Sequence, residues 1–457
     1  MPTHSPWLLP LLFTGVLMGA LDLAIIGPAL PAIRAEFGMN DRQLSVLFNA
    51  YVLCQMIGTP LFGKLADRVG ARLGYVAGVG LFGVGSLLLV LSTSPEMLYA
   101  GRALQGLGGG GIFPVAAAVI ATGLPREERG SALGILGTVF GLAFIIGPVM
   151  GGLLLPYGWH WLFLVNLPIA AVLIVGALKL LPTAPRPSSQ PVDIGGIATL
   201  SVGMTALVFA LSTFDLQAPA SYAPSGLALA LAAGLLAAFW RIEQRAADPL
   251  IRPGLFRSRP IVKAGVLSTA VGAIQAAGTF YPAFAVLALG VADSTAAWLM
   301  LPGVVVATVA SPLVGRMTRT VSLRAILVAG FILVGVSVAM YGLLPMSLPI
   351  FIAASLIGNA GMGGVLGAPL RLIVMNHSGP GESGAAQGLL SNASSVGRLV
   401  GAAFTGGIAA AVGTGAAGYQ AAFVGMTLVA IAATALALTL AHERPASTAG
   451  KDLQRAA

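Results

Sequence analysis

Apolar residues fill the chain in runs of about 20, separated by polar connectors or by connectors rich in proline and glycine. A helix of about 20 apolar residues spans the roughly 30 Å hydrocarbon core of a bilayer. The runs therefore predict an all-α membrane protein with fourteen transmembrane helices, over residues 8–31, 44–64, 73–92, 96–122, 130–155, 161–181, 194–213, 223–240, 261–289, 294–315, 323–344, 348–375, 384–411 and 418–441.

The basic residues predict the orientation of these helices, because cytoplasmic connectors of membrane proteins are enriched in lysine and arginine. With both termini in the cytoplasm, 20 of the 24 lysines and arginines fall in cytoplasmic segments. The outer connectors hold only Arg34 and Arg42, and Arg102 and Arg398 lie within predicted helices. The formal net charge of +9 therefore reflects topology, and we expect no nucleic-acid partner.

Composition excludes several other classes of protein. The chain is 57% hydrophobic and only 9% charged, with a mean hydropathy of +0.92, which leaves too few charges for a soluble surface. The first apolar run has no basic region before it, so we expect a retained helix rather than a cleaved signal peptide. The single cysteine, Cys54, excludes an internal disulfide, and the four histidines are scattered. We expect no metal, no cofactor and no enzymatic activity.

Two connectors divide the predicted helices into groups of six, two and six. Residues 181–193 are rich in proline and serine, and residues 241–260 are basic and contain proline. The predicted parts are an N-terminal six-helix bundle over 1–182, an inserted helix pair over 183–245, a C-terminal six-helix bundle over 246–445 and a cytoplasmic tail over 446–457.

The two six-helix groups share sequence features at a nearly constant spacing. Gly63-Lys64 and Gly315-Arg316 lie 252 residues apart (315 − 63). Asp22 and Gln275 each follow a Gly-Ala-aliphatic triplet, and further glycine matches occur at almost the same spacing. Matches in register predict two related bundles, as in transporters built from repeats.

Two glycine-rich stretches come close to nucleotide-binding patterns. GTPLFGKL (58–65) fits the P-loop pattern except that Leu65 replaces the hydroxyl that binds magnesium. GLGGGG (106–111) fits the dinucleotide pattern, but it lies inside a predicted membrane helix and follows no strand. We therefore expect no nucleotide, and we expect these glycines to allow close helix packing.

Three motifs resemble those of one transporter family. GKLADRVGAR (63–72) resembles the signature loop of the major facilitator superfamily, RALQGLGGGGIFP (102–114) its arginine-bearing motif in helix 4, and GPVMGG (147–152) its antiporter motif. With LDLAIIGPALPAI (21–33) and fourteen helices, the chain resembles the drug:proton antiporter branch. The resemblance implies two pseudo-symmetric six-helix bundles, with two inserted central helices, around a midplane cavity. The loop copy in the second half departs from the pattern, because Arg319 stands where Asp67 would repeat.

Asp22 is the only acidic residue well inside a predicted span. Placing an aspartate at a helix centre costs roughly 2.5–3.5 kcal/mol on insertion scales, which marks it as a functional candidate. Burial disfavours the ionised carboxylate, and this suits a reversible proton carrier. A structural carboxyl that bonds to a neighbouring helix is the alternative.

Arg102 is the other charge embedded in the N-terminal bundle. Helices 1 and 4 are adjacent in the resembled fold, so we expect Arg102 to reach Asp22 and to bias its proton affinity. Gln105 shares the helical face of Arg102. In the alternative, Arg102 snorkels to the lipid headgroups.

Arg398 lies about fourteen residues into the predicted helix 384–411. A buried arginine needs a carboxylate, carbonyls or an anionic ligand. We expect it to bind an anionic part of a substrate or a lipid headgroup, or to contact polar groups of the second helix such as Asn49 or Gln55. The residues expected at the faces of the substrate cavity are Asn49, Gln55, Gln105, Phe113, Gln275, Thr279, Asn359 and Arg398.

Two of the motifs carry expected gating residues. Gly63 and Gly70 are expected to allow a tight cytoplasmic turn, in which Asp67 meets Arg68, Arg72 or a helix end of the other bundle and latches the outward-facing state. A solvated turn is the alternative. In the antiporter motif, Pro148 removes a backbone hydrogen bond, and the small residues serve either gating or packing: Gly147, Gly151 and Gly152.

These features predict secondary active export of amphipathic, mainly cationic compounds in exchange for protons, by alternating access. The expected setting is a prokaryotic inner membrane, and the expected partners of this monomer are the small-molecule substrate, protons and the lipid bilayer. A transporter or flippase of lipids or other anionic amphiphiles is the alternative, and a non-transporting receptor or scaffold is a remote one.

Overall fold

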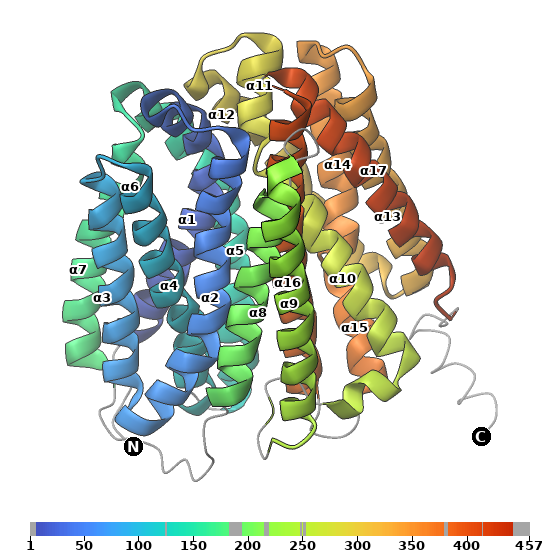
Figure 1. The fold of residues 1–457 in the computed structure, drawn as a ribbon. Coiled ribbons are helices and arrows are strands. Elements are labelled where there is room, and N and C mark those ends of the chain that lie inside the picture. The colour runs from blue at the N-terminus through green and yellow to red at the C-terminus, as the bar shows by residue number, and fades with distance from the viewer. Residues whose placement is uncertain are drawn as a thin grey trace. The chain divides into compact units, whose positions relative to one another are not determined.

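The structure is a computed structural model that describes residues 6–123, 126–181, 194–213, 219–246, 249, 253–378, 383–413 and 415–441. Every regular element in these ranges is helical (Figure 1). The α-helices are α1 Leu8–Phe37, α2 Asp41–Val69, α3 Ala71–Val90, α4 Pro95–Gly123, α5 Arg126–Leu154, α6 His160–Leu164, α7 Asn166–Leu180, α8 Ile194–Thr213, α9 Tyr222–Glu243, α10 Arg259–Gly278, α11 Tyr281–Leu289, α12 Asp293–Met317, α13 Leu323–Leu343, α14 Leu348–Val365, α15 Ala368–His377, α16 Ser383–Val412 and α17 Ala416–Leu438. Three short 3₁₀ turns cover Leu155–Tyr157, Pro219–Ser221 and Pro253–Arg257.

Every apolar run of the sequence coincides with one of these helices or with a pair of them. Within the described residues, twelve helical segments are long and apolar enough to cross a membrane. Two further runs lie in α5 and α8, where the apolar helical stretches are shorter, Leu142–Tyr157 and Gly195–Leu211. The protein is therefore an all-helical, multi-pass membrane protein, and a total of fourteen spans stays a prediction.

Three runs predicted as single helices are broken. The runs 161–181, 261–289 and 348–375 become the pairs α6/α7, α10/α11 and α14/α15. Pro282 and Pro369 lie in the first turns of α11 and α15. Proline lacks a backbone N–H, so it is well placed where a helix restarts and poorly placed in an unbroken helix. Hydrophobicity alone does not report such breaks.

The chain forms two compact units. The first comprises Met1–Val208, Leu227–Leu250 and Ala292–Trp298, and the second comprises Phe209–Gly226, Ile251–Val291 and Leu299–Ala457. The boundaries pass through α8, α9 and α12, whose residues are divided between the units. A separate inserted helix pair stays a prediction.

Glycines allow the helices of the first unit to pack closely. In this unit α4 packs on α2 and α3, and α1 packs on α5. A Cβ atom at Gly106 would collide with the backbone of Tyr51, and one at Gly108 with the backbone of Gly78. The glycine run 106–111 is therefore a packing surface within a helix, as expected, and not a dinucleotide loop.

The second unit is held by a similar contact. Its α10 packs on α16, and α13 packs on α14 and α17. Side chains at Gly272 and Gly397 would collide with the backbones of Ser394 and Thr269, respectively. Small residues on both helices thus bring α10 and α16 together.

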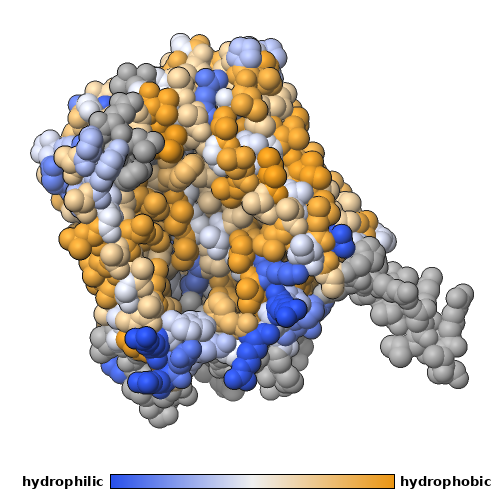
Figure 2. Space-filling model, turned by 45° about the vertical axis from the view of Figure 1, so that its right-hand side comes forward, coloured by the Kyte–Doolittle hydropathy of each residue, from blue (hydrophilic) through white to orange (hydrophobic). Residues whose placement is uncertain are grey.

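Many large apolar side chains lie on the outside of the protein. Leu227 is 74% exposed, Val172 is 68% exposed and Leu343 is 66% exposed. Figure 2 shows hydrophobic residues over much of the visible flank, with hydrophilic residues mostly toward its lower end and some near its upper end. An outer surface of this kind suits contact with lipid chains rather than with water.

The turn between α2 and α3 is shorter than predicted. Helix α2 continues to Val69, so Gly63 lies inside the helix, where a Cβ atom would meet no neighbour. Only Gly70 forms the turn, with a φ of 92° that favours glycine. The prediction that Gly63 shapes this turn was wrong, because the apolar and basic residues after it extend the helix by a further turn and a half.

Candidate functional site

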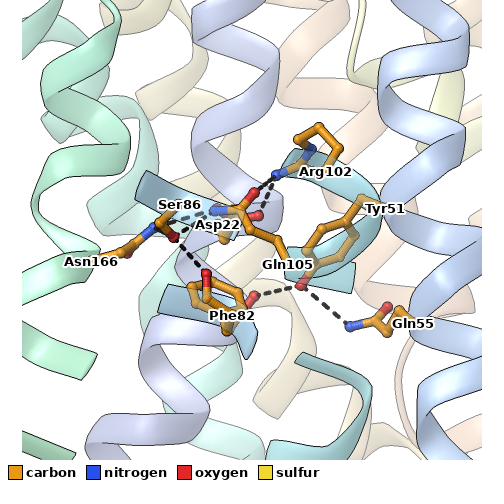
Figure 3. A network of polar contacts seen from close by, with 9 residues as sticks. Asp22, Tyr51, Gln55, Phe82, Ser86, Arg102, Gln105 and Asn166 are labelled. Carbon is orange, nitrogen blue, oxygen red and sulfur yellow. Dashed lines mark hydrogen bonds and ion pairs between the residues drawn. The ribbon is translucent and has the colours of Figure 1, made fainter. Parts of the chain in front are cut away.

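Asp22 and Arg102 form an ion pair in the interior of the first unit. Asp22 lies near the middle of α1, and the Nη1 atom of Arg102, on α4, donates to its Oδ2 atom (Figure 3). Both side chains have 0% exposure. The predicted approach of these two helices is confirmed, and the Arg102 guanidinium does not reach outward in the snorkelling arrangement.

Gln105 links the ion pair to α3. Its Nε2 atom donates to Asp22 Oδ1 over 2.9 Å and lies 2.8 Å from the Ser86 hydroxyl oxygen. Its Oε1 atom accepts from Arg102 Nη1 over 2.8 Å. Gln105 was expected at the face of the substrate cavity, but the structure places it inside this buried network, with 0% exposure. The one amide therefore contacts both charged groups.

Asn166, the first residue of α7, completes the network. Its Nδ2 atom lies 3.5 Å from Asp22 Oδ1 and 3.4 Å from Ser86 Oγ. Ser86 in turn donates to the carbonyl of Phe82 over 3.0 Å. Neither Asn166 nor Ser86 was predicted from the sequence. Each stands almost alone as a polar residue in an apolar run, and this is the signal that identifies them.

An aromatic ring supports the cation. The Cζ atom of Arg102 lies 4.3 Å from the centroid of the Tyr51 ring, a cation–π geometry. The Tyr51 hydroxyl donates to the carbonyl of Gly19 over 3.3 Å and accepts a long hydrogen bond, 3.5 Å, from Gln55 Nε2. Gln55 thus lies at the edge of this network, one helical turn from Tyr51 (Figure 3).

The network contains one negative and one positive charge, both completely buried. Such a pair is stable only while both charges are present and hydrogen-bonded, because a lone buried charge is costly. Among the described residues, the Nε and Nη2 atoms of Arg102 and the Oδ1 atom of Asn166 have no hydrogen-bond partner. The part of the site that the structure describes therefore has two unused donors on the charged Arg102 and one unused acceptor on the neutral Asn166.

The other expected cavity residues do not join this network by hydrogen bonds. Asn49, on α2, is 1% exposed, and neither of its amide atoms has a hydrogen-bond partner in the described part of the chain. Phe113 has 43% exposure. Asn359 donates to the Ser355 carbonyl of its own helix over 2.9 Å. The remaining pair, Gln275 and Thr279, is half-buried at the end of α10 and at its C-cap.

Arg398 lies near the middle of α16 in the second unit. Its guanidinium donates to two hydroxyls of the same helix, Ser395 over 2.8 Å and Ser394 over 3.4 Å. Both are neutral acceptors.

Arg72 has a partner that was not predicted from the sequence. Its Nε atom donates to the carbonyl of Leu181, the residue that follows α7, over 2.7 Å. A basic side chain at the carbonyl end of a helix is favourable. Arg68 is exposed, and the side chain of Asp67 lies outside what the structure describes, so the expected latch stays a prediction.

The antiporter motif forms a close contact with α1. A Cβ atom at Gly147 would collide with Ala24, and one at Gly151 with the ring of Pro28. Gly152 is buried in the same helix, and α5 continues through Pro148 without a break. The packing role of these glycines is evident, and a gating role stays a prediction.

Comparison with known proteins shows the family. The sequence profile described as Major Facilitator Superfamily matches residues 12–274 and 264–456, which together cover most of the chain. The chain belongs to the major facilitator superfamily. It is therefore a membrane transporter rather than an enzyme, and within the described residues no group of three or more metal-ligating side chains is placed to hold an ion.

Bacterial relatives carry transporter names. The chain is 33% identical to the "Uncharacterized MFS-type transporter YfiU" of Bacillus subtilis over 398 residues, 84% of this chain and 76% of that protein. It is 30% identical to "Multidrug resistance protein 3" of the same organism over 68% of this chain and 61% of the relative. The "Multidrug transporter protein MdtP", also of Bacillus subtilis, is 28% identical over 86% of this chain and 73% of its own length. These names are consistent with the drug:proton antiporter branch.

Solved structures support the same fold. A crystal structure of a mutant of the nucleoside transporter NupG matches with a TM-score of 0.67 and 12% identity, covering 94% of this chain and 98% of that one. The human organic anion transporter MFSD10 matches with a TM-score of 0.64 and 17% identity, covering 95% and 100%. At these identities the likeness concerns the fold alone.

Proposed function

We propose that the protein exports amphipathic, mainly cationic compounds in exchange for protons, and that Asp22 carries the proton. The observation that carries this proposal is the completely buried ion pair between Asp22 and Arg102 inside a shell of neutral amides and a hydroxyl. The names of the multidrug relatives support the substrate class.

The ion pair gives a physical basis for exchange. A proton on Asp22 cancels the attraction that holds Arg102, and a buried arginine without its counter-ion is costly. A cationic substrate that approaches the same carboxylate competes with both the proton and Arg102. Proton binding and substrate binding then exclude each other, which is the requirement for antiport. When the site opens alternately to each side of the membrane, a proton moves in and a substrate moves out.

The test uses purified protein in proteoliposomes with an imposed proton gradient and ethidium as the lipophilic cation. We expect the wild type to move ethidium against its gradient and Asp22→Asn to lose proton-driven transport. Glu36→Gln is the matched control, since Glu36 lies on the same helix but bonds to Trp159 Nε1, over 2.6 Å, outside the network. Unchanged proton-driven transport in Asp22→Asn would refute the assignment, and an absence of any transport would favour a receptor or scaffold.

A second candidate is transport of lipids or other anionic amphiphiles. Arg398 motivates it, because a cation near the middle of a predicted membrane helix can attract an anionic group, and its guanidinium donates to the hydroxyls of Ser394 and Ser395. Fluorescent lysophosphatidylglycerol in the same proteoliposomes tests this candidate. Transport of this lipid by the wild type that is lost in Arg398→Gln would support the candidate. An equal rate in the wild type and the variant would count against it.

The membrane topology belongs to the same proposal. Fourteen spans with both termini in the cytoplasm, in a prokaryotic inner membrane, place 20 of the 24 basic residues on the cytoplasmic side. Because Cys54 is the only cysteine, a Cys54→Ala background allows single-cysteine labelling of each connector. Labelling of a cysteine at position 216 from outside and of one at 188 only from inside is expected.

A further inference from the structure

A carboxyl group that takes up a proton changes its hydrogen-bonding needs. The ionised form only accepts hydrogen bonds, whereas the protonated form also donates one through its O–H group. In a buried site the new donor needs an acceptor within reach, because an unpaired buried donor costs free energy. The surroundings of Asp22 must therefore serve two different states if it carries a proton.

The structure distinguishes the two oxygens of Asp22. Oδ2 accepts from the Arg102 guanidinium, so a proton there would meet the cation directly. Oδ1 faces the amides of Gln105 and Asn166, at 2.9 and 3.5 Å. Oδ1 is therefore the oxygen better placed to take up the proton, although both neighbouring amides direct donors toward it.

Most acceptors around Oδ1 are already engaged. The Oε1 atom of Gln105 accepts from Arg102 over 2.8 Å. The Ser86 oxygen lies 2.8 and 3.4 Å from the amide nitrogens of Gln105 and Asn166. The Oδ1 atom of Asn166 is the exception, since it is buried and has no hydrogen-bond partner in the described part of the chain.

We propose that Asn166 is a positioning residue whose amide donates to Asp22 when the carboxyl is ionised and accepts from it when the carboxyl is protonated. A half-turn about the Cβ–Cγ bond exchanges the amino and carbonyl ends of the amide, which have nearly the same shape. The 3.5 and 3.4 Å bonds of the present orientation are long, so little is lost when they break. Asn166 then keeps the Asp22 carboxyl in the same position in both protonation states. This role rests on the proposed function of Asp22.

Few charged or titratable groups compete for this role. Helices α2, α4, α5, α6 and α7 all pack on α1. His160, the first residue of α6, lies 3.9 Å from Glu36 near the far end of α1, away from Asp22. Of their described side chains, Arg102 on α4 faces the carboxyl, and Tyr51 on α2 lies behind the guanidinium. Asn166 on α7 is neutral, and the described stretch 142–152 of α5 is apolar. The acid form of Asp22 thus depends on neutral acceptors.

Infrared difference spectroscopy of the reconstituted protein during a pH titration tests the proposal. The C=O stretch of a protonated carboxyl lies apart from the amide bands and rises in frequency when its O–H loses an acceptor. Asp22→Asn assigns the band. We expect Asn166→Leu, which neither donates nor accepts, to raise the band frequency and to move the titration midpoint by about one pH unit, a tenfold change in proton affinity.

Three further variants make the result decisive. Asn166→Ala gives the same test with a smaller side chain should the leucine variant not fold. Asn166→Ser, whose hydroxyl donates and accepts, is expected to restore the band and the midpoint at least in part. The control Thr405→Val removes a buried hydroxyl that bonds only within α16, to Gly401 over 2.8 Å, and should change neither.

The outcomes separate this inference from the proposed function. A band that disappears in Asp22→Asn but keeps its frequency and midpoint in folded Asn166→Leu or Asn166→Ala overturns the role of Asn166 alone. A titrating band that survives in Asp22→Asn shows that another group carries the proton, and then both proposals fail.

Discussion

The guanidinium of Arg102 lies over the ring of Tyr51, with 4.3 Å between its Cζ atom and the ring centroid. The ring belongs to α2, while the carboxylate that neutralises the cation belongs to α1. Arg102 is thus held by two helices through two different interactions. We expect the cation–π contact to persist when a proton neutralises Asp22, because the ring carries no titrating charge.

This arrangement predicts different effects of two substitutions at Tyr51. A buried cation–π contact is worth about 1–2 kcal/mol, or a factor of about 5–30 in an equilibrium. Tyr51→Phe keeps the aromatic face and should retain most proton-driven transport in proteoliposomes. Tyr51→Leu should reduce it about tenfold at equal protein content, and an equal loss in both variants would contradict the role of the ring.

The buried ion pair predicts a strong coupling between its two partners. Removing either charge alone leaves the other unpaired in the interior, at a cost of about 3–5 kcal/mol when it stays ionised. We expect Arg102→Gln to lower the unfolding temperature in detergent and the double variant Asp22→Asn/Arg102→Gln to recover much of the loss. Strictly additive effects of the two changes would show that the pair is not coupled.

Glycine packing predicts a local steric effect. A Cβ atom at Gly106 would collide with the backbone of Tyr51, whereas one at Gly80 on α3 would meet no atom within 4 Å. Gly106→Ala should destabilise the protein by about 1–3 kcal/mol, because the backbone of the neighbouring helix cannot easily move away from the added methyl group. Gly80→Ala is the matched control and should be neutral or stabilising by up to about 1 kcal/mol. Thermal unfolding of the two variants checks the difference.

The bond between Arg72 and the Leu181 carbonyl predicts a modest stability effect. Arg72→Ala removes a 2.7 Å hydrogen bond from a charged donor to the end of α7. We expect a loss of about 1–2 kcal/mol in unfolding free energy. Arg259→Ala, an exposed arginine at the start of α10, should change stability by no more than about 0.5 kcal/mol. Equal losses in the two variants would mean that the contact adds nothing.

The helical architecture could be predicted because hydrophobic run length follows directly from bilayer thickness. The ends and breaks of helices could not. The continuation of α1 to Phe37 through Pro28 and Pro31, and of α2 past Gly63, runs against the local signals of proline and glycine, which predict helix ends only weakly. Hydrophobicity also says nothing of the restart of α11 at Tyr281.

The charged half of the candidate site was visible in the sequence, and the neutral half was not. Asp22 and Arg102 stand out because charges are costly in apolar runs. Ser86 and Asn166 are tolerated singly in membrane helices, so only the meeting of α1, α3, α4 and α7 identifies them. The partner of Arg72 could not be predicted either, since a backbone carbonyl leaves no mark in a sequence.

In the proposed mechanism, Asp22 is the group that exchanges a proton for substrate. Addition of ethidium to the purified protein in weakly buffered, mildly acidic solution, with a pH-sensitive dye, measures protons released on binding. We predict release of about one proton per protein molecule from the wild type and from Glu36→Gln, and none from Asp22→Asn. Equal release from Asp22→Asn would contradict the account.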